Sequence, residues 1–438
     1  MKKRVSLLLL AAILLVSLVL ITPAGQARDL TKLGLKASYD LKGNTVTYIS
    51  WTADRMKNYL ETDPVVKGRL KEAEKFFNCK FHFLQTRDIP ATNMARLMAG
   101  DSAYDIWNSQ TRIGYYELVS QGAAYPMGDL LPEAFYKGLS HQEQQAVKIL
   151  EFNGKIYGIG STHWGGGMWN VGSMVTFYNK TLIDREGLPD PYALYKENKW
   201  TWERCDEIVR KATKDTNGDG EIDQFGIYRV RPFALMVSNG GATTRNDRSG
   251  RPVFAMDEPA ALEALQLYAD WKQIGAVGGR FLDGNAALDM HQVYEAHNSG
   301  YVKMKDVFSI VPIPMGPRAN KYVYPHWSPE VVIIPVNSAN PEAMAAINAF
   351  LFRESDVSRN LVLARHVRTR EGAEVFTRIQ REWAGETKYL YEAFGGATGM
   401  LVDLTIKEII NGEKTPAVGM AEIKPIIQGM LDEVFYKK

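Results

Sequence analysis

Five oxygen-bearing side chains alternate along one polar segment and could together bind a cation. In chain order they are Asp215, Asn217, Asp219, Glu221 and Asp223. Carboxylate and amide oxygens at alternate positions are typical of calcium loops, which end on a bidentate Glu. Gly226 stands at that last position, so a tight site is excluded and a weaker structural Ca²⁺ is the remaining possibility. The alternative is a turn in which the same side chains accept Asx hydrogen bonds. We expect no other cofactor.

The chain is also rich in aromatic side chains, with 9 Trp and 21 Tyr. A sugar ring has an apolar C–H face and a rim of hydroxyl groups, so its site needs flat aromatic platforms with polar side chains beside them. The candidate platforms are Trp51, Trp164, Trp169, Tyr294 and Trp327. The candidate polar partners are Asp54, Arg55, Asn108, Gln110 and His163. For each aromatic residue, ordinary core packing is the alternative.

Signatures of catalysis are missing from the sequence. It contains no G-x-S-x-G elbow, no H-E-x-x-H and no G-x-x-x-x-G-K-[ST] phosphate loop. Its many carboxylates could supply a glycosidase pair, but no spacing selects two of them. The formal net charge of +2 lacks the excess of Lys and Arg that nucleic acid attracts, so we expect no nucleic-acid partner. The sequence thus identifies no catalytic site, and a secreted carbohydrate-active enzyme stays an alternative.

The first 27 residues have the composition of a signal peptide. Three basic residues open the segment, residues 7–21 are almost wholly apolar, and small residues lie at 25–27. The apolar run is shorter than the roughly 20 residues that span a bilayer. We therefore expect cleavage and export to the periplasm or the cell surface, with an uncleaved anchor as the alternative.

The polar residues 28–43 have no periodicity and predict a linker, after which strands and helices alternate. Strands are predicted at 45–51, 80–84 and 104–107, and helices over 66–77 and 92–98. This order predicts a parallel, doubly wound α/β sheet with helices on both faces.

Ligands bind doubly wound sheets beyond the carboxyl ends of the strands. Trp51, Asp54 and Arg55 follow the first predicted strand, while Asn108 and Gln110 follow the third. We therefore expect these five side chains to face a cleft.

A segment rich in glycine and tryptophan, at 158–172, interrupts the regular pattern. Three consecutive glycines between Trp164 and Trp169 exclude a helix there. We expect a loop that crosses between lobes and carries His163 and both tryptophans. The alternative is a surface loop whose tryptophans pack on the body of the protein.

The rest of the chain again alternates strands and helices. Strands are predicted at 175–178, 308–314 and 331–335, and helices from Thr201, over 259–271, after Asn340 and through much of the tail beyond 352.

Seven short motifs, taken in order, resemble the family 1 extracellular solute-binding proteins of carbohydrate ABC importers. They are Ala99–Ile106, Asn153–Gly158, Phe177–Lys180, Trp200–Glu203, Asp215–Gly226, Gly284–Met290 and Val311–Pro317. In the first motif Tyr104 replaces the proline of the family pattern, and Tyr294 falls where the family often places a ligand-stacking tryptophan. The resemblance covers nearly the whole mature chain.

That resemblance implies a two-lobed periplasmic-binding-protein type II fold, as in maltose-binding proteins, with a mostly parallel sheet in each lobe. Lobe 1 would comprise 44–160 and 308–350, lobe 2 would comprise 170–305 and 353–438, and the crossovers would lie near 160–170, 305–308 and 350–353. Cys79 and Cys205 then fall in different lobes and are predicted to be buried free thiols.

The implied function is capture of a carbohydrate, expected to be an oligosaccharide, by closure of the lobes around it. A ligand can shift such an equilibrium only by its differential affinity for the two states. The implied partners are the membrane subunits of an importer, and we expect a monomer. Gram-positive members usually carry a lipobox cysteine at the end of the leader, and none is found here, so no lipid anchor is expected. A receptor for a non-sugar solute is the remaining alternative, and it would have a charged cleft.

Overall fold

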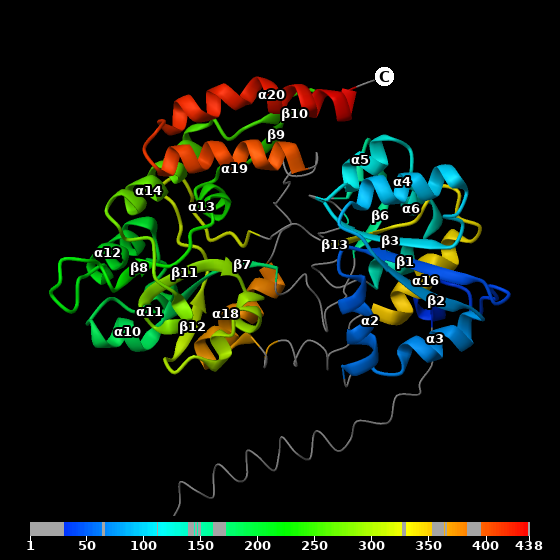
Figure 1. Cartoon of the computed structure of the whole chain (residues 1–438), viewed down its shortest axis with the longest axis horizontal. Coiled ribbons are helices and arrows are strands. Elements are labelled where there is room, and N and C mark those ends of the chain that lie inside the picture. Colours follow the sequence, from blue (N-terminus) through cyan, green and yellow to red (C-terminus); the bar gives the residue numbers. More distant parts are fainter. Residues whose placement is uncertain are drawn as a thin grey trace, which may run out of the picture.

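The computed structural model describes residues 30–63, 66–111, 113–138, 150–160, 172–325, 330–352, 366–382 and 396–436, with the single residues 144, 147 and 363. Within them the chain forms two lobes that lie side by side (Figure 1). The predicted signal peptide at 1–27 falls outside the described residues. No helix of the described part is both long and apolar enough to cross a membrane.

Lobe 1 is built on a five-stranded sheet with the strand order β2-β1-β3-β13-β6. The strands are β1 (Thr45–Ser50), β2 (Lys80–Gln85), β3 (Asp105–Gln110), β6 (Gly158–Gly160) and β13 (Glu330–Ile333). As predicted, β1 runs parallel to both β2 and β3. Strand β13 pairs antiparallel with both β3 and β6, so the sheet is mixed, with four of its five strands pointing the same way and β13 reversed, which agrees with the predicted mostly parallel sheet.

Helices cover both faces of this sheet because successive residues of a strand point to opposite sides. Tyr48 packs into the core beneath α16, where its hydroxyl donates to Asn348 Oδ1 at 2.8 Å, and its neighbour Ile49 belongs to the opposite core. One face carries α2 (Ala53–Thr62), α3 (Arg69–Phe77) and α16 (Pro341–Phe352), and the other carries α4 (Ile89–Ala99) and α5 (Tyr115–Ser120) (Figure 1). The smaller elements are η1 (Leu30–Leu33), α6 (Met127–Leu130), α7 (Glu133–Lys137), β4 (Glu151–Phe152) and β5 (Lys155–Ile156).

The predicted linker at 28–43 is wrong for its described part. Leu30, Leu35, Tyr39 and Leu41 are all buried in the core of lobe 1. The ring of Tyr39 stacks on Phe77 with centroids 5.6 Å apart. These apolar residues lie at irregular spacings along mostly non-repetitive backbone, so no period of a helix or strand revealed them.

Lobe 2 is built on a four-stranded sheet with the order β12-β7-β11-β8. The strands are β7 (Met174–Asn179), β8 (Phe225–Ile227), β11 (Ala286–Gln292) and β12 (Phe308–Val311). Strand β8 runs parallel to β11, whereas β7 is antiparallel to both β11 and β12. This sheet is therefore mixed as well.

The position of β12 corrects the predicted boundaries of the lobes. Residues 308–350 were expected in lobe 1, but Phe308 to Val311 pair with β7 in lobe 2. The chain is still in lobe 2 at Pro325, whose carbonyl accepts from Met174 N at 2.7 Å. The second crossover therefore follows Pro325 and not residue 305, because an apolar run predicts a buried strand without showing which sheet it joins.

Helices surround the second sheet and include the long C-terminal hairpin. They are α10 (Lys180–Arg185), α11 (Pro191–Lys196), α12 (Trp202–Ala212), α13 (Pro232–Ser238), α14 (Pro259–Gln273), α15 (Glu295–Asn298), α18 (Arg370–Glu382), α19 (Gly396–Ile410) and α20 (Pro416–Tyr436), with the 3-10 turns η3 (Phe281–Asp283) and η4 (Tyr301–Lys303) and the hairpin β9 (Thr244–Asn246) and β10 (Pro252–Phe254). Thr201 caps α12 by accepting from Arg204 N, as predicted.

Cys79 and Cys205 lie in separate cores and are buried free thiols.

Candidate functional site

A cavity of about 1110 Å³ lies between the lobes. Its lobe 1 wall includes Arg87 and Asp88, which follow β2, and Ile113 and Gly114, which follow β3. The carboxyl ends of parallel strands are where doubly wound sheets bind ligands. The opposite wall is α19 of lobe 2. Two smaller cavities of about 660 and 250 Å³ are lined by lobe 2 alone, so the largest of these three spaces in the described part is the one shared by both lobes.

Local contacts fix the loops of the lobe 1 wall. Asp88 caps α4, with its Oδ1 accepting from Ala91 N at 3.1 Å. Gly114 has a φ of +79°, and a Cβ there would lie 2.3 Å from Pro90 Cγ. Only glycine therefore lets α5 begin against the first turn of α4. Burial and the nearby charge of Asp88 raise the pKa of Glu117, whose carboxyl also lines the cavity.

Asn108 and Gln110 lie at the carboxyl end of β3, as predicted, but both are buried within the sheet edge. Asn108 Oδ1 accepts from Ser50 Oγ at 2.9 Å, which joins the ends of β1 and β3. Gln110 Nε2 donates to Glu330 Oε1 at 2.8 Å. Asn108 Nδ2 is a buried donor without a hydrogen-bond partner among the described residues. These two side chains thus form a buried polar layer at the carboxyl end of β3.

The other predicted lobe 1 residues follow β1 as expected. Trp51 is half-buried against the core, and its Nε1 has no hydrogen-bond partner in the described part. Asp54 and Arg55 are exposed in the first turn of α2. Their contact with a ligand stays a prediction.

The corresponding edge of lobe 2 carries a buried ionic network at the carboxyl ends of β8 and β11. Arg229 donates to both oxygens of Asp289 at 3.0 and 2.8 Å, and its Nη1 lies 3.3 Å from Glu295 Oε2. Tyr301 donates to the same Asp289 carboxylate at 2.7 Å. Burial acts to lower the pKa of Arg229, but the hydrogen bonds to Asp289 together with the nearby charges of Asp289, Tyr301 and Glu295 outweigh it, so the net pKa of Arg229 is raised. Burial raises the pKa of Asp289 despite this partner.

Tyr294 follows β11 beside this network. Its hydroxyl donates to Asn298 Oδ1 at 3.0 Å, and Asn298 in turn donates to Glu295 at 3.4 Å. The ring is half-buried, which is compatible with the predicted stacking on a ligand. Next to it, His291 is 3% exposed and hydrogen-bonds Arg231 through Nε2.

Four predicted ligand residues lie outside the described part of the chain. They are His163, Trp164, Trp169 and Trp327. Their roles stay predictions.

The predicted calcium loop shows the arrangement of its alternative, a turn held by Asx hydrogen bonds. Asp215 accepts from the backbone N–H groups of Asn217, Gly218 and Gly220 at 3.1, 2.6 and 2.7 Å, and these bonds lower its pKa. Within the described residues, no group of three His, Cys, Asp or Glu side chains is placed to hold a metal ion. Ca²⁺ binding by Asp215, Asn217, Asp219, Glu221 and Asp223 therefore stays a prediction.

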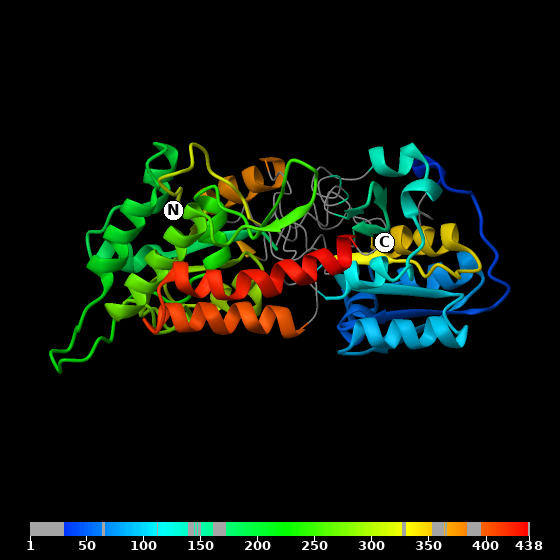
Figure 2. The same ribbon diagram turned by 90° about the horizontal axis from the view of Figure 1, so that it is seen from above.

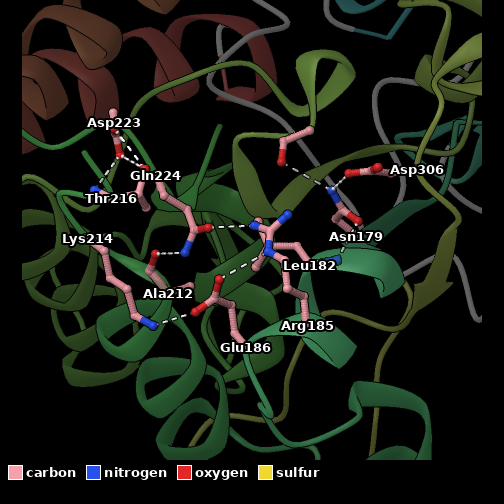
Figure 3. A network of polar contacts seen from close by, with 11 residues as sticks. Asn179, Leu182, Arg185, Glu186, Ala212, Lys214, Thr216, Asp223, Gln224 and Asp306 are labelled. Carbon is pink, nitrogen blue, oxygen red and sulfur yellow. Dashed lines mark hydrogen bonds and ion pairs between the residues drawn. The ribbon is translucent and has the colours of Figure 1, made fainter.

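The ends of this loop are tied to α10 and α12, as Figure 3 shows. Asp223 accepts from Thr216 Oγ1 at 2.8 Å and closes the loop. Gln224 Nε2 donates to the carbonyl of Ala212 at 2.9 Å, and its Oε1 accepts from Arg185 at 2.7 Å. The motif therefore stabilises lobe 2 away from the interlobe cavity.

Several cavity residues were missed by the sequence analysis. On α19 these are Met400 and Leu404, which are 62% and 53% exposed and line the cavity with Asp403 and Lys407. Two apolar residues four positions apart share one helix face. That spacing was visible in the sequence, but nothing local distinguished this face from one buried in the core.

Solved structures with the same fold include three bacterial binding proteins. An ABC substrate-binding protein from Listeria monocytogenes, in complex with cycloalternan, is 15% identical with a TM-score of 0.60, and the match covers 89% of this chain and 99% of that one. The GacH receptor of Streptomyces glaucescens, studied with acarbose, is 14% identical with a TM-score of 0.62 and the same coverage. UgpB from Mycobacterium tuberculosis, in complex with glycerophosphocholine, is 14% identical with a TM-score of 0.59, and the match covers 89% of this chain and 98% of that one.

No curated protein sequence matches the chain. The family model of the bacterial extracellular solute-binding proteins, however, matches residues 89–355, which is more than half of the chain. This match includes the carboxyl end of β3, all of the lobe 2 sheet and the return to lobe 1. The chain belongs to the bacterial extracellular solute-binding protein family.

Proposed function

We propose that this protein captures a carbohydrate between its lobes and delivers it to an ABC importer, without catalysing a reaction. The observation that carries the proposal is the interlobe cavity of about 1110 Å³ at the carboxyl ends of β2 and β3. It is large enough for a ligand of several sugar rings, since pockets for small molecules commonly measure about 300–1,000 Å³.

The described lining of the cavity offers apolar surface and hydrogen-bonding groups but no aromatic side chain, so the flat platforms that a sugar needs would come from Trp51, Tyr294 and residues outside the described part. Met94, Met400 and Leu404 offer apolar surface, while Asp88 and Glu117 offer hydrogen-bond acceptors. Cycloalternan and acarbose, which occur with two of the similar structures, are both carbohydrates. Glycerophosphocholine, bound by the third, makes a non-sugar solute the second candidate.

The proposal includes a monomer that is exported by a cleaved leader and works in the periplasm or at the cell surface without a lipid anchor. The membrane subunits of the importer would receive the closed, loaded form. The proposed site extends beyond this cavity to Trp51, Asp54, Arg55 and Tyr294, which follow β1 and β11 but do not line it. Asn108 and Gln110 are 0% and 2% exposed and would support this edge beneath the ligand, and the polar and aromatic residues outside the described part would complete the contacts.

A thermal-shift screen of the mature protein tests this function. The panel holds maltotriose, mannotriose, acarbose, cycloalternan and glycerophosphocholine. A ligand that binds only the folded state raises Tm, by an amount equivalent to about 2.7 kcal/mol at 100 times its Kd. We expect a shift with at least one oligosaccharide, and a smaller shift for the same ligand in Tyr294→Ala. A shift with glycerophosphocholine alone would favour the non-sugar candidate, and conversion of a sugar to products would reveal an enzyme.

A further inference from the structure

The C-terminal helix α20 belongs to lobe 2 for most of its length. Met420, Ile427 and Leu431 are fully buried against that lobe. Gln428 reinforces the attachment by accepting from Phe254 N at 2.9 Å and donating to the carbonyl of Pro252 at 3.2 Å. Four residues later, Asp432 accepts from Arg251 Nε at 3.0 Å. The helix is thus fastened to the β9–β10 hairpin until its last turn.

That last turn reaches the other lobe. The end of α20 extends over lobe 1 in both views of the molecule (Figures 1 and 2). There the ring of Phe435 lies 5.9 Å from the ring of Tyr116 and 5.1 Å from that of Phe152. With Phe435 in place, Tyr116 and Phe152 are only 2% and 6% exposed, so these lobe 1 rings form an aromatic pocket around Phe435. Aromatic rings at these distances attract one another beyond the effect of the area they bury.

The aromatic pocket lies beside the interlobe cavity. Tyr116 precedes Glu117, and Glu117 and Gln121 of the same short helix line the cavity. On the lobe 2 side, α19 packs along α20 and forms the other wall. A change in the width of the cavity must therefore move the end of α20 relative to Tyr116.

We propose that α20 is a strut between the lobes, in which Phe435 limits how far they move apart and together. The Phe435 contact adds a side-chain fastening made by the last turn of the chain. This inference does not depend on which ligand the protein binds, and it can fail or hold independently of the proposed carbohydrate function.

Single-molecule Förster transfer on the ligand-free full chain tests the strut. Dyes are attached to cysteines introduced as Glu61→Cys on α2 and Glu203→Cys on α12, two exposed positions in different lobes. The native Cys79 and Cys205 are 3% and 0% exposed and do not compete for labelling. In the Phe435→Ala background we expect a broader distribution of interlobe distances than in the parent protein.

The matched control is Tyr436→Ala. Tyr436 is the neighbouring aromatic residue, but its ring lies 5.3 Å from the guanidinium of Arg251 in its own lobe. This control should leave the distance distribution unchanged. Phe435→Leu keeps an apolar side chain in the pocket and should give a distribution of intermediate width, between those of the parent protein and Phe435→Ala. If Phe435→Ala does not fold, Phe435→Leu provides the test. Distributions of equal width in the parent, Phe435→Ala and Phe435→Leu proteins would overturn the strut.

Discussion

His291 shows how the lobe 2 network should make stability depend on pH. Burial, with the neighbouring charges of Arg231 and Arg229, lowers the pKa of His291 from 6.5 to about 2. The carboxylate of Glu295 lies 3.8 Å from Nδ1 and does not reverse this effect. The folded protein therefore keeps His291 neutral at a pH where the unfolded chain binds a proton.

Because the unfolded state takes up this proton first, the free energy of unfolding should fall as the pH drops below 6.5. The loss is about 1.4 kcal/mol per pH unit, or roughly 2 kcal/mol at pH 5. His291→Gln should remove this slope between pH 6.5 and pH 5. This holds whatever the substitution does to the free energy of unfolding at pH 7. Urea unfolding at pH 5, 6 and 7 measures the slope, and His82→Gln on the exposed side of β2 is the control. Parallel curves for wild type and His291→Gln would contradict the assignment.

The same network marks what local sequence could not reveal at the residue scale. Asp289 lies in the middle of β11 between two apolar neighbours, and its partner Arg229 is 60 positions away. A buried carboxylate is tolerated only where a cation and hydrogen bonds compensate it. The presence of Asp289 in a strand thus indicated a hidden partner, but only the fold identifies it. By contrast, the motif at Gly284–Met290 predicted the position of Tyr294 just after a strand, and Tyr294 follows β11.

Gly114 carries the strongest prediction at the scale of an element. Alanine at this position would combine an unfavourable positive φ with a Cβ 2.3 Å from the Pro90 ring. We expect Gly114→Ala to destabilise the protein by about 2–4 kcal/mol, since overpacking alone costs about 1–3 kcal/mol and left-handed backbone about 1 kcal/mol more. Thermal or urea unfolding measures the loss.

Gly429→Ala is the control for that measurement. Gly429 lies on the exposed side of α20, and no atom lies within 4 Å of an added Cβ. Alanine in a helix interior should stabilise by roughly 0.5–1 kcal/mol. If both variants unfold at the same denaturant concentration as wild type, the close approach of α4 and α5 does not require glycine at position 114.

Elements were predictable where their signals are local. The caps of α12 and α16 were expected at Thr201 and Asn340, and both side chains accept the expected backbone N–H. The parallel pairing of β1 with β2 and β3 followed from the alternation of strands and helices. The assignment of β12 to the lobe 2 sheet could not be predicted in this way. Strand pairing there depends on crossovers between the lobes, and the direction of a crossover leaves no local pattern in the sequence. The buried segment 30–41 was missed for the related reason that irregular backbone has no period.

At the scale of the whole molecule, the order of short motifs was enough to predict two lobes and their alternation along the chain. The walls of the interlobe cavity were not predictable in this way. Loops after β2 and β3 meet α19, which comes from the opposite end of the sequence, and only the packing of the C-terminal hairpin on lobe 2 brings them together. The cavity is therefore a property of the assembled lobes.

If the proposed function is correct, this cavity must narrow when ligand binds. A bulkier side chain in its lining should oppose that narrowing. Leu404 lines the cavity and is 53% exposed, so Leu404→Trp adds bulk there without disturbing the core. Closure then becomes less favourable, and apparent affinity falls with the population of the competent state. For the sugar that gives the largest thermal shift, we expect a Kd about tenfold higher, which corresponds to about 1.4 kcal/mol.

Calorimetry measures that Kd, and small-angle scattering measures the radius of gyration with and without the sugar. Wild type should contract on binding, and Leu404→Trp should contract less. Met98→Trp is the matched control, because Met98 is 83% exposed on α4 and is not part of the cavity lining. Equal affinity and equal contraction in Leu404→Trp and wild type would show that the lobes do not close across this cavity. Ligand capture would then have to use another surface.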